Sequence, residues 1–207
     1  MSPNIRLSTA LLAAVFLLFP LKQSEAVSNF HFSTMVNYEL TEEYWPGWDL
    51  TLLYNNQWGV RYTNISDVLF LESKKETNDS LDNIELAGEL RLPMILRTMD
   101  YNTFEGGNKT VFDFITAYMA FGYNSYDIDE THKVYSALAG NLVKDTIKDS
   151  LNTEVMATAI GIYGGERFLV IDTRILYYRG ETKKSNVSGD KYTFNDWMLV
   201  IAIGIGF

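Results

Sequence analysis

Charged residues recur at every second position in several stretches of the sequence, and this spacing decides what chemistry they could do. A period of two is that of a β-strand, so residues spaced in this way share one face. Nine charged residues fall on such faces and are predicted to line an interior: Glu39, Asp49, Arg61, Glu85, Glu89, Arg91, Arg97, Asp172 and Arg174. Charges crowded into a narrow interior have to pair with one another. The pattern therefore predicts a network of salt bridges, and the alternative is a narrow path for ions or small solutes.

His31 and Ser33 are the candidates for a catalytic pair. Two residues apart on a strand, they share a face, and a histidine can activate a serine as a nucleophile. The spacing resembles the His-x-Ser motif of the outer-membrane lipid A deacylases, which implies a lipid-modifying enzyme as an alternative. In that family the motif lies late in the chain, and here Glu39 is too far along the strand to orient the histidine. We therefore expect two polar interior residues and no enzymatic activity.

The acidic run Asp127, Asp129 and Glu130 is the candidate for a cation site. Alternate carboxylates can bind a hard cation such as calcium, but the run lacks the glycine and the twelve-residue loop of the common calcium motif. From residue 130 to residue 151, two apolar stripes recur at helical spacing: Val134, Leu138 and Leu142, and Val143, Ile147 and Leu151. We therefore predict an amphipathic helix over 130–151, with the acids at its N-terminus, and neither a metal nor a cofactor.

The last stretch of the chain shows the clearest strand pattern. Over residues 197–207, large apolar side chains alternate with small ones, and the chain ends on Phe207. A greasy face opposite a face of small residues is typical of a strand between a lipid bilayer and a crowded barrel interior. The stretch resembles the C-terminal strand of bacterial outer-membrane β-barrels. That resemblance implies that Phe207 belongs to the signal read by the barrel-insertion machinery.

The N-terminus indicates export. Arg6 is followed by an apolar run over residues 7–21 and by Ser24-Glu25-Ala26, which has small residues where a signal peptidase would cut before Val27. These features predict a signal peptide over 1–26 and a single β-barrel domain over 27–207. The rest of the sequence contains no apolar run long enough for a transmembrane helix, and it contains no cysteine. A formal net charge of −9 argues against nucleic acid as a partner.

Alternation and turn residues predict eight strands, over 29–40, 48–54, 57–63, 84–97, 111–123, 153–163, 166–179 and 197–207. The strand over 57–63 has 68–71 as its candidate continuation, and the phase of the strands over 111–123 and 153–163 stays open. The second, fourth and sixth connections are 55–56, 99–110 and 164–165. The remaining connections, 41–47, 72–83, 124–151 and 180–191, are mostly longer and more polar. Bacterial barrels have short periplasmic turns and long outer loops, so we expect both termini on the periplasmic side.

Taken together, the sequence resembles the small bacterial outer-membrane barrels of the OmpA, OmpX and OmpW size class and the broad porin family. The resemblance implies an eight-stranded antiparallel up-and-down transmembrane barrel in the outer membrane of a Gram-negative cell. Its expected partners are outer-membrane lipid, lipopolysaccharide and the insertion machinery. The expected function is envelope integrity or interaction through surface loops, and the alternative is a narrow porin-like channel. A secreted lipocalin-like barrel would need the charged face of 84–97 outside, whereas we expect that face inside.

Overall fold

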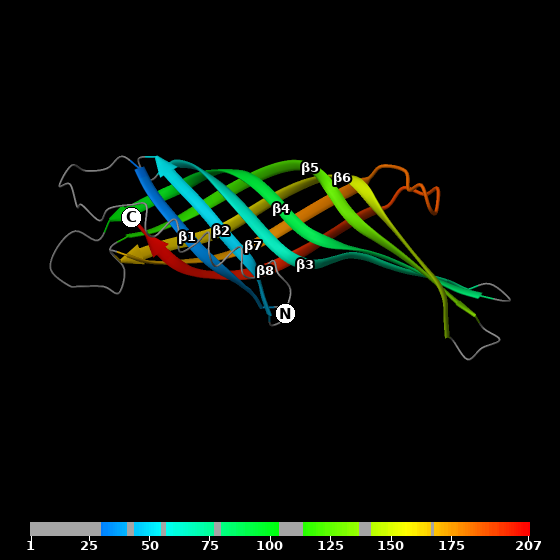
Figure 1. Ribbon diagram of the computed structural model, residues 1–207. Helices are drawn as coiled ribbons and strands as arrows, with labels where there is room; N and C mark the ends of the chain where they lie inside the picture. The colour runs from blue at the N-terminus through cyan, green and yellow to red at the C-terminus, as the bar shows by residue number, and fades with distance from the viewer. Residues whose placement is uncertain are drawn as a thin grey trace.

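The computed structural model describes residues 30–40, 44–54, 57–76, 80–103, 114–136, 142–166 and 168–207. Within this part of the chain, eight antiparallel strands follow one another around a closed barrel, with β1 beside β8 (Figure 1). The strands are β1 (Phe30–Glu39), β2 (Tyr44–Tyr54), β3 (Trp58–Glu76), β4 (Ser80–Thr103), β5 (Phe114–Ser136), β6 (Leu142–Glu166), β7 (Leu169–Thr182) and β8 (Thr193–Gly206). The predicted antiparallel up-and-down barrel is confirmed, and its architecture is that of the small outer-membrane barrels. The predicted signal peptide lies outside the described residues.

The last strand closes the barrel against the first. β8 pairs with β1 from Ser33↔Gly206 to Glu39↔Val200, in the phase that its alternation predicts. Its small residues lie on the crowded side: a Cβ atom on Gly204 would collide with the backbone carbonyl of Thr34. The alternation of large and small residues in this stretch therefore follows from the closure itself.

Four strands continue past the others at the end of the barrel opposite the C-terminus (Figure 1). β2 leaves β3 at Gly47↔Ile65, and β7 leaves β6 at Thr153↔Thr182. Beyond these points β3, β4, β5 and β6 pair only with one another and form what we call the projecting sheet. The sheet includes much of the sequence that was predicted to form the polar connections 72–83 and 124–151.

The amphipathic helix predicted over 130–151 is wrong. The described residues of this range belong to β5 and β6, which pair from Phe114↔Gly165 to Ser136↔Leu142. Residues four apart, such as Ile147 and Leu151, share one side of a strand as well as one side of a helix. The spacing alone could not separate the two, and pairing with the long β5 decides for the strand. No helix in the described residues is long and apolar enough to cross a membrane.

β4 carries its leucines inward, which is the opposite of the predicted orientation. Leu90, Leu92 and Leu96 have exposed fractions of 0%, 0% and 2%. The register explains why: Met94 lies opposite Arg61 of β3, and directly opposed residues share a face of the sheet. Because Arg61 points inward, every second residue of β4 in phase with Met94 points inward as well.

The charged residues of β4 therefore point outward, and their predicted place in the interior is wrong: Glu85, Glu89, Arg91 and Arg97. Arg97 lies over the ring of Trp58, with its guanidinium carbon 4.6 Å from the ring centre. Arg91 pairs with Glu89 of its own strand at 2.8 Å. These charges are solvated or paired at the two ends of a short apolar stretch, which is why they are tolerated on the outer face.

The structure also settles the phase of β5 and β6, which the sequence left open. On β5, Tyr118 is buried and its neighbour Met119 is exposed. On β6, Ala159 is buried and Ile160 is exposed. Small residues of β6 therefore face the interior, as the terminal strand's small residues do.

We call the end of the barrel where β2 ends and β3 begins the turn end. Near this end the outer surface is apolar on every strand. We call this surface the apolar belt, and its exposed members include Val36, Leu50, Leu52, Val60, Ile95, Met119, Phe121, Met156, Ile160, Ile162, Leu169, Ile175 and Ile203. Aromatic side chains lie along the edge of the belt nearest the turn end, among them Phe30 against Tyr54 and Phe168 near Phe207. Such a belt with an aromatic edge is the surface that a membrane β-barrel presents to lipid.

Candidate functional site: the charged interior

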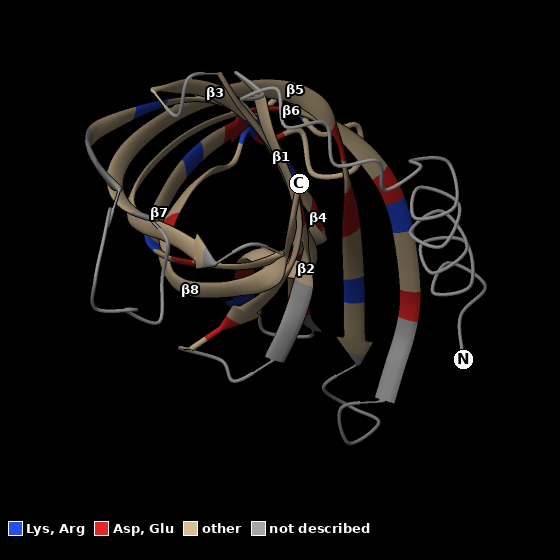
Figure 2. Ribbon diagram, turned by 90° about the vertical axis from the view of Figure 1, so that its left-hand side faces the viewer, with Lys and Arg blue, Asp and Glu red and all other residues tan. Residues whose placement is uncertain are grey.

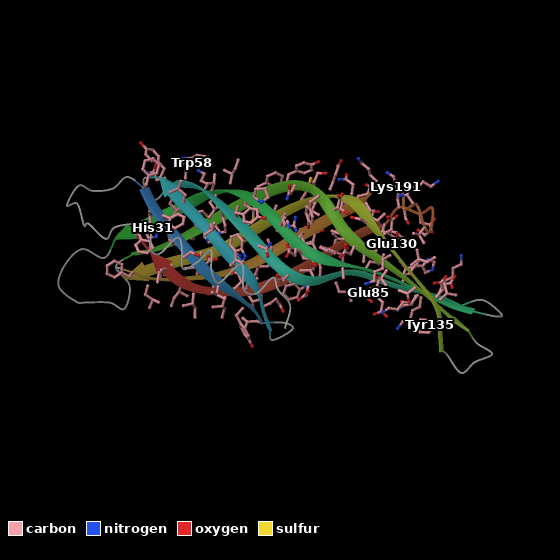
Figure 3. All side chains as sticks on the ribbon, in the orientation of Figure 1. His31, Trp58, Glu85, Glu130, Tyr135 and Lys191 are labelled. Atoms are coloured by element: carbon pink, nitrogen blue, oxygen red, sulfur yellow. The ribbon has the colours of Figure 1, made fainter. Side chains whose placement is uncertain are left out.

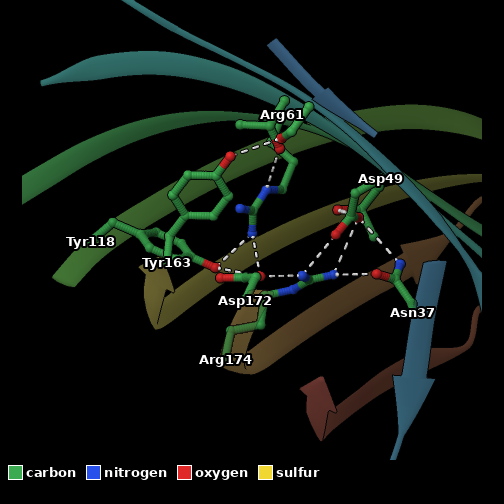
Figure 4. A network of polar contacts seen from close by, with 10 residues as sticks. Asn37, Asp49, Arg61, Tyr118, Tyr163, Asp172 and Arg174 are labelled. Carbon is green, nitrogen blue, oxygen red and sulfur yellow. Dashed lines mark hydrogen bonds and ion pairs between the residues drawn. The ribbon is translucent and has the colours of Figure 1, made fainter. Parts of the chain in front are cut away.

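Two arginines and two aspartates meet inside the barrel and form what we call the charge cluster: Asp49 of β2, Arg61 of β3, and Asp172 and Arg174 of β7 (Figure 4). Their side chains have an exposed fraction of 0%. Arg61 Nη1 lies 2.8 Å from Asp172 Oδ2, and Arg174 Nη1 lies 2.7 Å from Asp49 Oδ2 and 2.5 Å from Asp172 Oδ2. Arg174 thus joins the two carboxylates into one unit with two positive and two negative charges.

Neutral side chains also bind Arg61. Its Nη1 donates to the Tyr118 hydroxyl at 2.6 Å, and its Nε donates to Thr51 Oγ1 at 3.0 Å. The Tyr118 hydroxyl in turn donates to Asp172 Oδ2 at 3.0 Å. The guanidinium also lies 4.8 Å from the centre of the Tyr118 ring, so β5 is tied to β3 and β7 through one tyrosine.

Asp49 is held in a similar way on the other side of the charge cluster. Its Oδ1 accepts hydrogen bonds from Thr63 Oγ1 at 2.6 Å and from Asn37 Nδ2 at 3.2 Å. Arg174 Nη2 donates to the same oxygen at 3.2 Å and to Asn37 Oδ1 at 3.4 Å. The charge cluster therefore connects side chains from β1, β2, β3, β5 and β7.

The balance of charge explains how this arrangement can be buried. An isolated charge away from water is expensive, and a buried ion pair is tolerated only with good geometry and additional hydrogen bonds. Here partners on five strands supply ion pairs and hydrogen bonds, while Arg61 Nη2, Asp172 Oδ1 and Arg174 Nε are buried without a hydrogen-bond partner among the described residues. The adjoining void, next to Arg61, Tyr118 and Tyr163, leaves no room for a water molecule. The arrangement braces the barrel and fills it at this level.

Five of the nine predicted interior charges point inward: Glu39, Asp49, Arg61, Asp172 and Arg174. Four of them form the charge cluster, whereas Glu39 is buried at the C-terminal end of β1, opposite Val200. The four charges of β4 point outward, where Glu85 reaches Lys133 of β5 at 3.6 Å. Figure 2, viewed along the barrel, shows charged positions on several strands of the barrel wall.

On the side of the charge cluster away from the C-terminus, an apolar group fills much of the interior. The rings of Phe70 and Phe194 lie 4.7 Å apart, and Tyr178 contacts both of them edge-on. The inward leucines of β4 belong to the same buried group. This apolar half of the interior was not predicted, although the alternation of β4 contained the signal.

His31 and Ser33 share the inner face, and both bond to the hydroxyl of Tyr163. His31 Nε2 lies 2.7 Å from the hydroxyl of Tyr163, and this hydroxyl donates to Ser33 Oγ at 3.0 Å. Tyr163 thus bridges the two side chains, whereas activation of a nucleophile uses a hydrogen bond from the serine to the histidine itself. The chain of three lies near the turn end of the barrel, where Figure 3 shows His31. Sequence reasoning missed Tyr163, which lies in phase with the small residues of the strand over 153–163.

The acidic run of β5 is split between the two sides of the sheet. Asp127 and Asp129 are exposed on the outer side, whereas Glu130 is buried inside. In the part of the chain that the structure describes, no group of three histidine or acidic side chains could hold a metal ion. The candidate cation site is therefore not formed by these residues.

Glu130 instead anchors the connection between β7 and β8, and we call this arrangement the mouth cap. Ser185 Oγ donates to Glu130 Oε2 at 2.7 Å, and the Tyr192 hydroxyl donates to Glu130 Oε1 at 3.1 Å. Ser188 Oγ lies 2.5 Å from the same hydroxyl. Burial is the largest cause of the raised pKa of Tyr192. Figure 3 shows Glu130 and Lys191 at the end of the barrel opposite His31.

Comparison with known proteins gives a limited result. No protein-family model matches the chain, and no curated protein matches it. Two crystal structures of Ail, the attachment invasion locus protein of Yersinia pestis, resemble it, one of them in complex with the heparin analogue sucrose octasulfate. Each shares 14% sequence identity, covers 86% of this chain and 96% of Ail, and has a TM-score of 0.33 or 0.34. The description of the barrel therefore rests on its own strand pairing.

Proposed function

We propose that the chain is an integral protein of the bacterial outer membrane whose barrel is sealed and has no enzymatic role. The charge cluster carries this proposal. Four fully buried, mutually neutralised side chains cross the interior at the level of the apolar belt. An interior of eight strands is just wide enough for side chains to fill.

The apolar belt supports the membrane location. A soluble protein rarely exposes a continuous apolar patch of more than a few hundred Å², whereas this belt surrounds the barrel. The argument from β4 against a lipocalin-like barrel fails because the charged face of that strand does point outward. Other strands supply the argument against a lipocalin-like barrel instead, since Ile160, Ile175 and Ile203 are exposed by 58%, 55% and 45%. A water-soluble barrel would turn these side chains inward.

The orientation and the partners follow from the same proposal. The short turns and Phe207 face the periplasm, and the mouth cap and the projecting sheet face outward. The belt contacts outer-membrane lipid and lipopolysaccharide, and Phe207 serves the insertion machinery during biogenesis. The role that fits best is envelope integrity, or interaction through the mouth cap and the projecting sheet.

A narrow channel is the main competing function. It would need a continuous path through the interior, and the charge cluster and the leucines of β4 occupy that space. A lipid-modifying enzyme is disfavoured because Tyr163 separates His31 from Ser33. Replacing His31 or Ser33 by alanine is therefore expected to leave lipid A unchanged.

Envelope fractionation tests the proposal directly. The full chain is produced in a Gram-negative host, and its envelope is separated on a density gradient and washed with alkaline carbonate. We expect the protein in the lipopolysaccharide-rich fraction, resistant to the wash, with heat-dependent migration on gels. Recovery as a soluble periplasmic protein would support the lipocalin-like alternative and overturn the proposal.

A further inference from the structure

The barrel wall has a gap in its hydrogen-bond ladder between β4 and β5. These strands pair from Ser80↔Ser136 to Ala87↔Asp129 and again from Met94↔Gly122 onward, in the same register. Between these stretches, residues 88–93 and 123–128 are not paired with one another. The two strands keep their pairing with their other neighbours here: β5 pairs with β6 throughout, and β4 pairs with β3 over most of this part. The gap belongs to this one seam.

Pro93 accounts for part of the gap. Its carbonyl faces β5, because a Cβ atom on Gly122 would lie 2.6 Å from that oxygen. The nitrogen of the same residue points to the same side of a strand, and proline has no N–H to donate. A side chain takes over one of the lost bonds: Asn124 Nδ2 donates to the Arg91 carbonyl at 2.8 Å.

A groove of about 580 Å³ lies on the outer surface beside this gap. Outward side chains from five strands line it, including Pro93 on the β4 side of the seam and Tyr123 on the β5 side. The groove also reaches the wall itself, since Met94 and Gly122 contribute to its lining.

The strand register gives the groove a direction. Phe32 lies opposite Leu52, Leu52 opposite Val60, Val60 opposite Ile95, and Ile95 opposite Phe121. These five residues form one row across β1 to β5. With about 4.8 Å between neighbouring strands, four steps give a row of about 19 Å.

We propose that this groove binds one acyl chain of a phospholipid from the periplasmic leaflet. The inference rests on the proposed membrane location. The groove is continuous with the apolar belt, where hydrocarbon is the surrounding medium, and its lining is almost entirely apolar. Phe32 and Val60 each lie two residues from an aromatic residue at the turn end, Phe30 and Trp58, which places that end of the row in the leaflet that faces the periplasm. That leaflet of the outer membrane is made of phospholipid.

The test uses two substitutions of matched exposure. Val60 in the groove and Ile175 on β7 are both exposed by 55%, and Ile175 lies outside the groove. The mature chain and the variants Val60→Phe and Ile175→Phe are refolded into vesicles of palmitoyl-oleoyl phosphatidylethanolamine and phosphatidylglycerol, to which palmitic acid is added. Each protein is extracted into mild detergent, and retained lipid is identified by native mass spectrometry. Heat-dependent migration on gels verifies folding, and Ile95→Phe serves as a second groove-filling variant.

We expect one retained phospholipid on the mature chain and on Ile175→Phe, and loss of that adduct from Val60→Phe and Ile95→Phe. Equal retention by all four proteins, retention of palmitic acid alone, or no adduct on the mature chain would overturn the inference. If the mature chain integrates into the vesicles but retains no lipid, only the inference fails. If the chain does not integrate at all, the proposed function fails with it.

Discussion

β4 and β7 both alternate charged residues with aliphatic ones, yet they turn opposite faces to the interior. β7 buries Asp172 and Arg174 and exposes Ile175. β4 buries Leu92 and exposes Arg91. β7 is paired without interruption on both sides, whereas β4 is unpaired from β5 over residues 88–93. Alternation therefore fixes the period of a strand, and its neighbours decide which face points inward.

The neighbours act through register and through what the interior already contains. β7 meets Arg61 and Asp49, so its charges find partners of opposite sign inside. The upper part of the interior is lined by aromatic rings such as Phe70, and only the apolar face of β4 can pack there. A charge from β4 placed among these rings would be buried away from water.

The largest expected effect comes from breaking the buried pairs of β7. Asp172→Asn removes the charge that Arg61 and Arg174 share and leaves buried positive charge uncompensated. Losing one partner of a buried ion pair costs about 3–5 kcal/mol. Glu89→Gln on β4, which removes an exposed carboxylate, is the matched control and should cost at most about 1 kcal/mol. Urea unfolding of the refolded proteins in lipid would measure both values, and equal costs would contradict the assignment of faces.

A slightly smaller effect is expected from truncating the inward face of β4. Leu92 has an exposed fraction of 0%. Leu92→Ala should therefore lower the free energy of unfolding by about 2–5 kcal/mol, as for other buried leucines. Ile175→Ala, at a lipid-facing position on β7, should change it much less. If the two substitutions gave the reverse order in urea unfolding, β4 would have the orientation that the sequence analysis predicted.

Restoring the pairing between β4 and β5 should raise the free energy of unfolding modestly. Pro93→Ala supplies the N–H that β4 lacks toward β5, and a hydrogen bond typically adds about 0.5–1.5 kcal/mol. The substitution should also slow amide hydrogen exchange around Tyr123, while exchange in β7 stays unchanged. Hydrogen exchange measured by mass spectrometry or NMR tests this. Exchange that remains fast around Tyr123 would mean that proline is not what keeps the seam open.

The smallest effect concerns charges on the outer face of β7, above the apolar belt. Lys191 Nζ lies 2.8 Å from Glu181, and its hydrogen bond and charge lower the pKa of that carboxyl. A lowered pKa stabilises the folded state above the ordinary glutamate pKa, and this contribution is lost as the pH falls through the lowered value. Lys191→Met should return the Glu181 pKa to its ordinary range without a measurable change in Tm. An NMR titration that is the same in both proteins would exclude the interaction in solution.

The sequence predicted the barrel, the strand number and the sense of β1, β2, β3, β7 and β8, because these strands pair a clear large face with a polar or small one. It did not predict the sense of β4, where leucines alternate with charges and either face could point inward. It assigned a helix to residues of β5 and β6 because a spacing of four fits both structures. Of the interior site, it identified Asp49, Arg61, Asp172 and Arg174. It missed Tyr118 and Tyr163, because they lie on the two strands whose phase the sequence left open.

Planar-bilayer conductance of the refolded mature chain tests the sealed interior most directly. The chain should insert, resist external protease and remain electrically silent, because the charge cluster and the inward face of β4 fill the barrel. Steady and reproducible single-channel steps would contradict this account. They would show that a path passes the charge cluster and would support the narrow channel in its place.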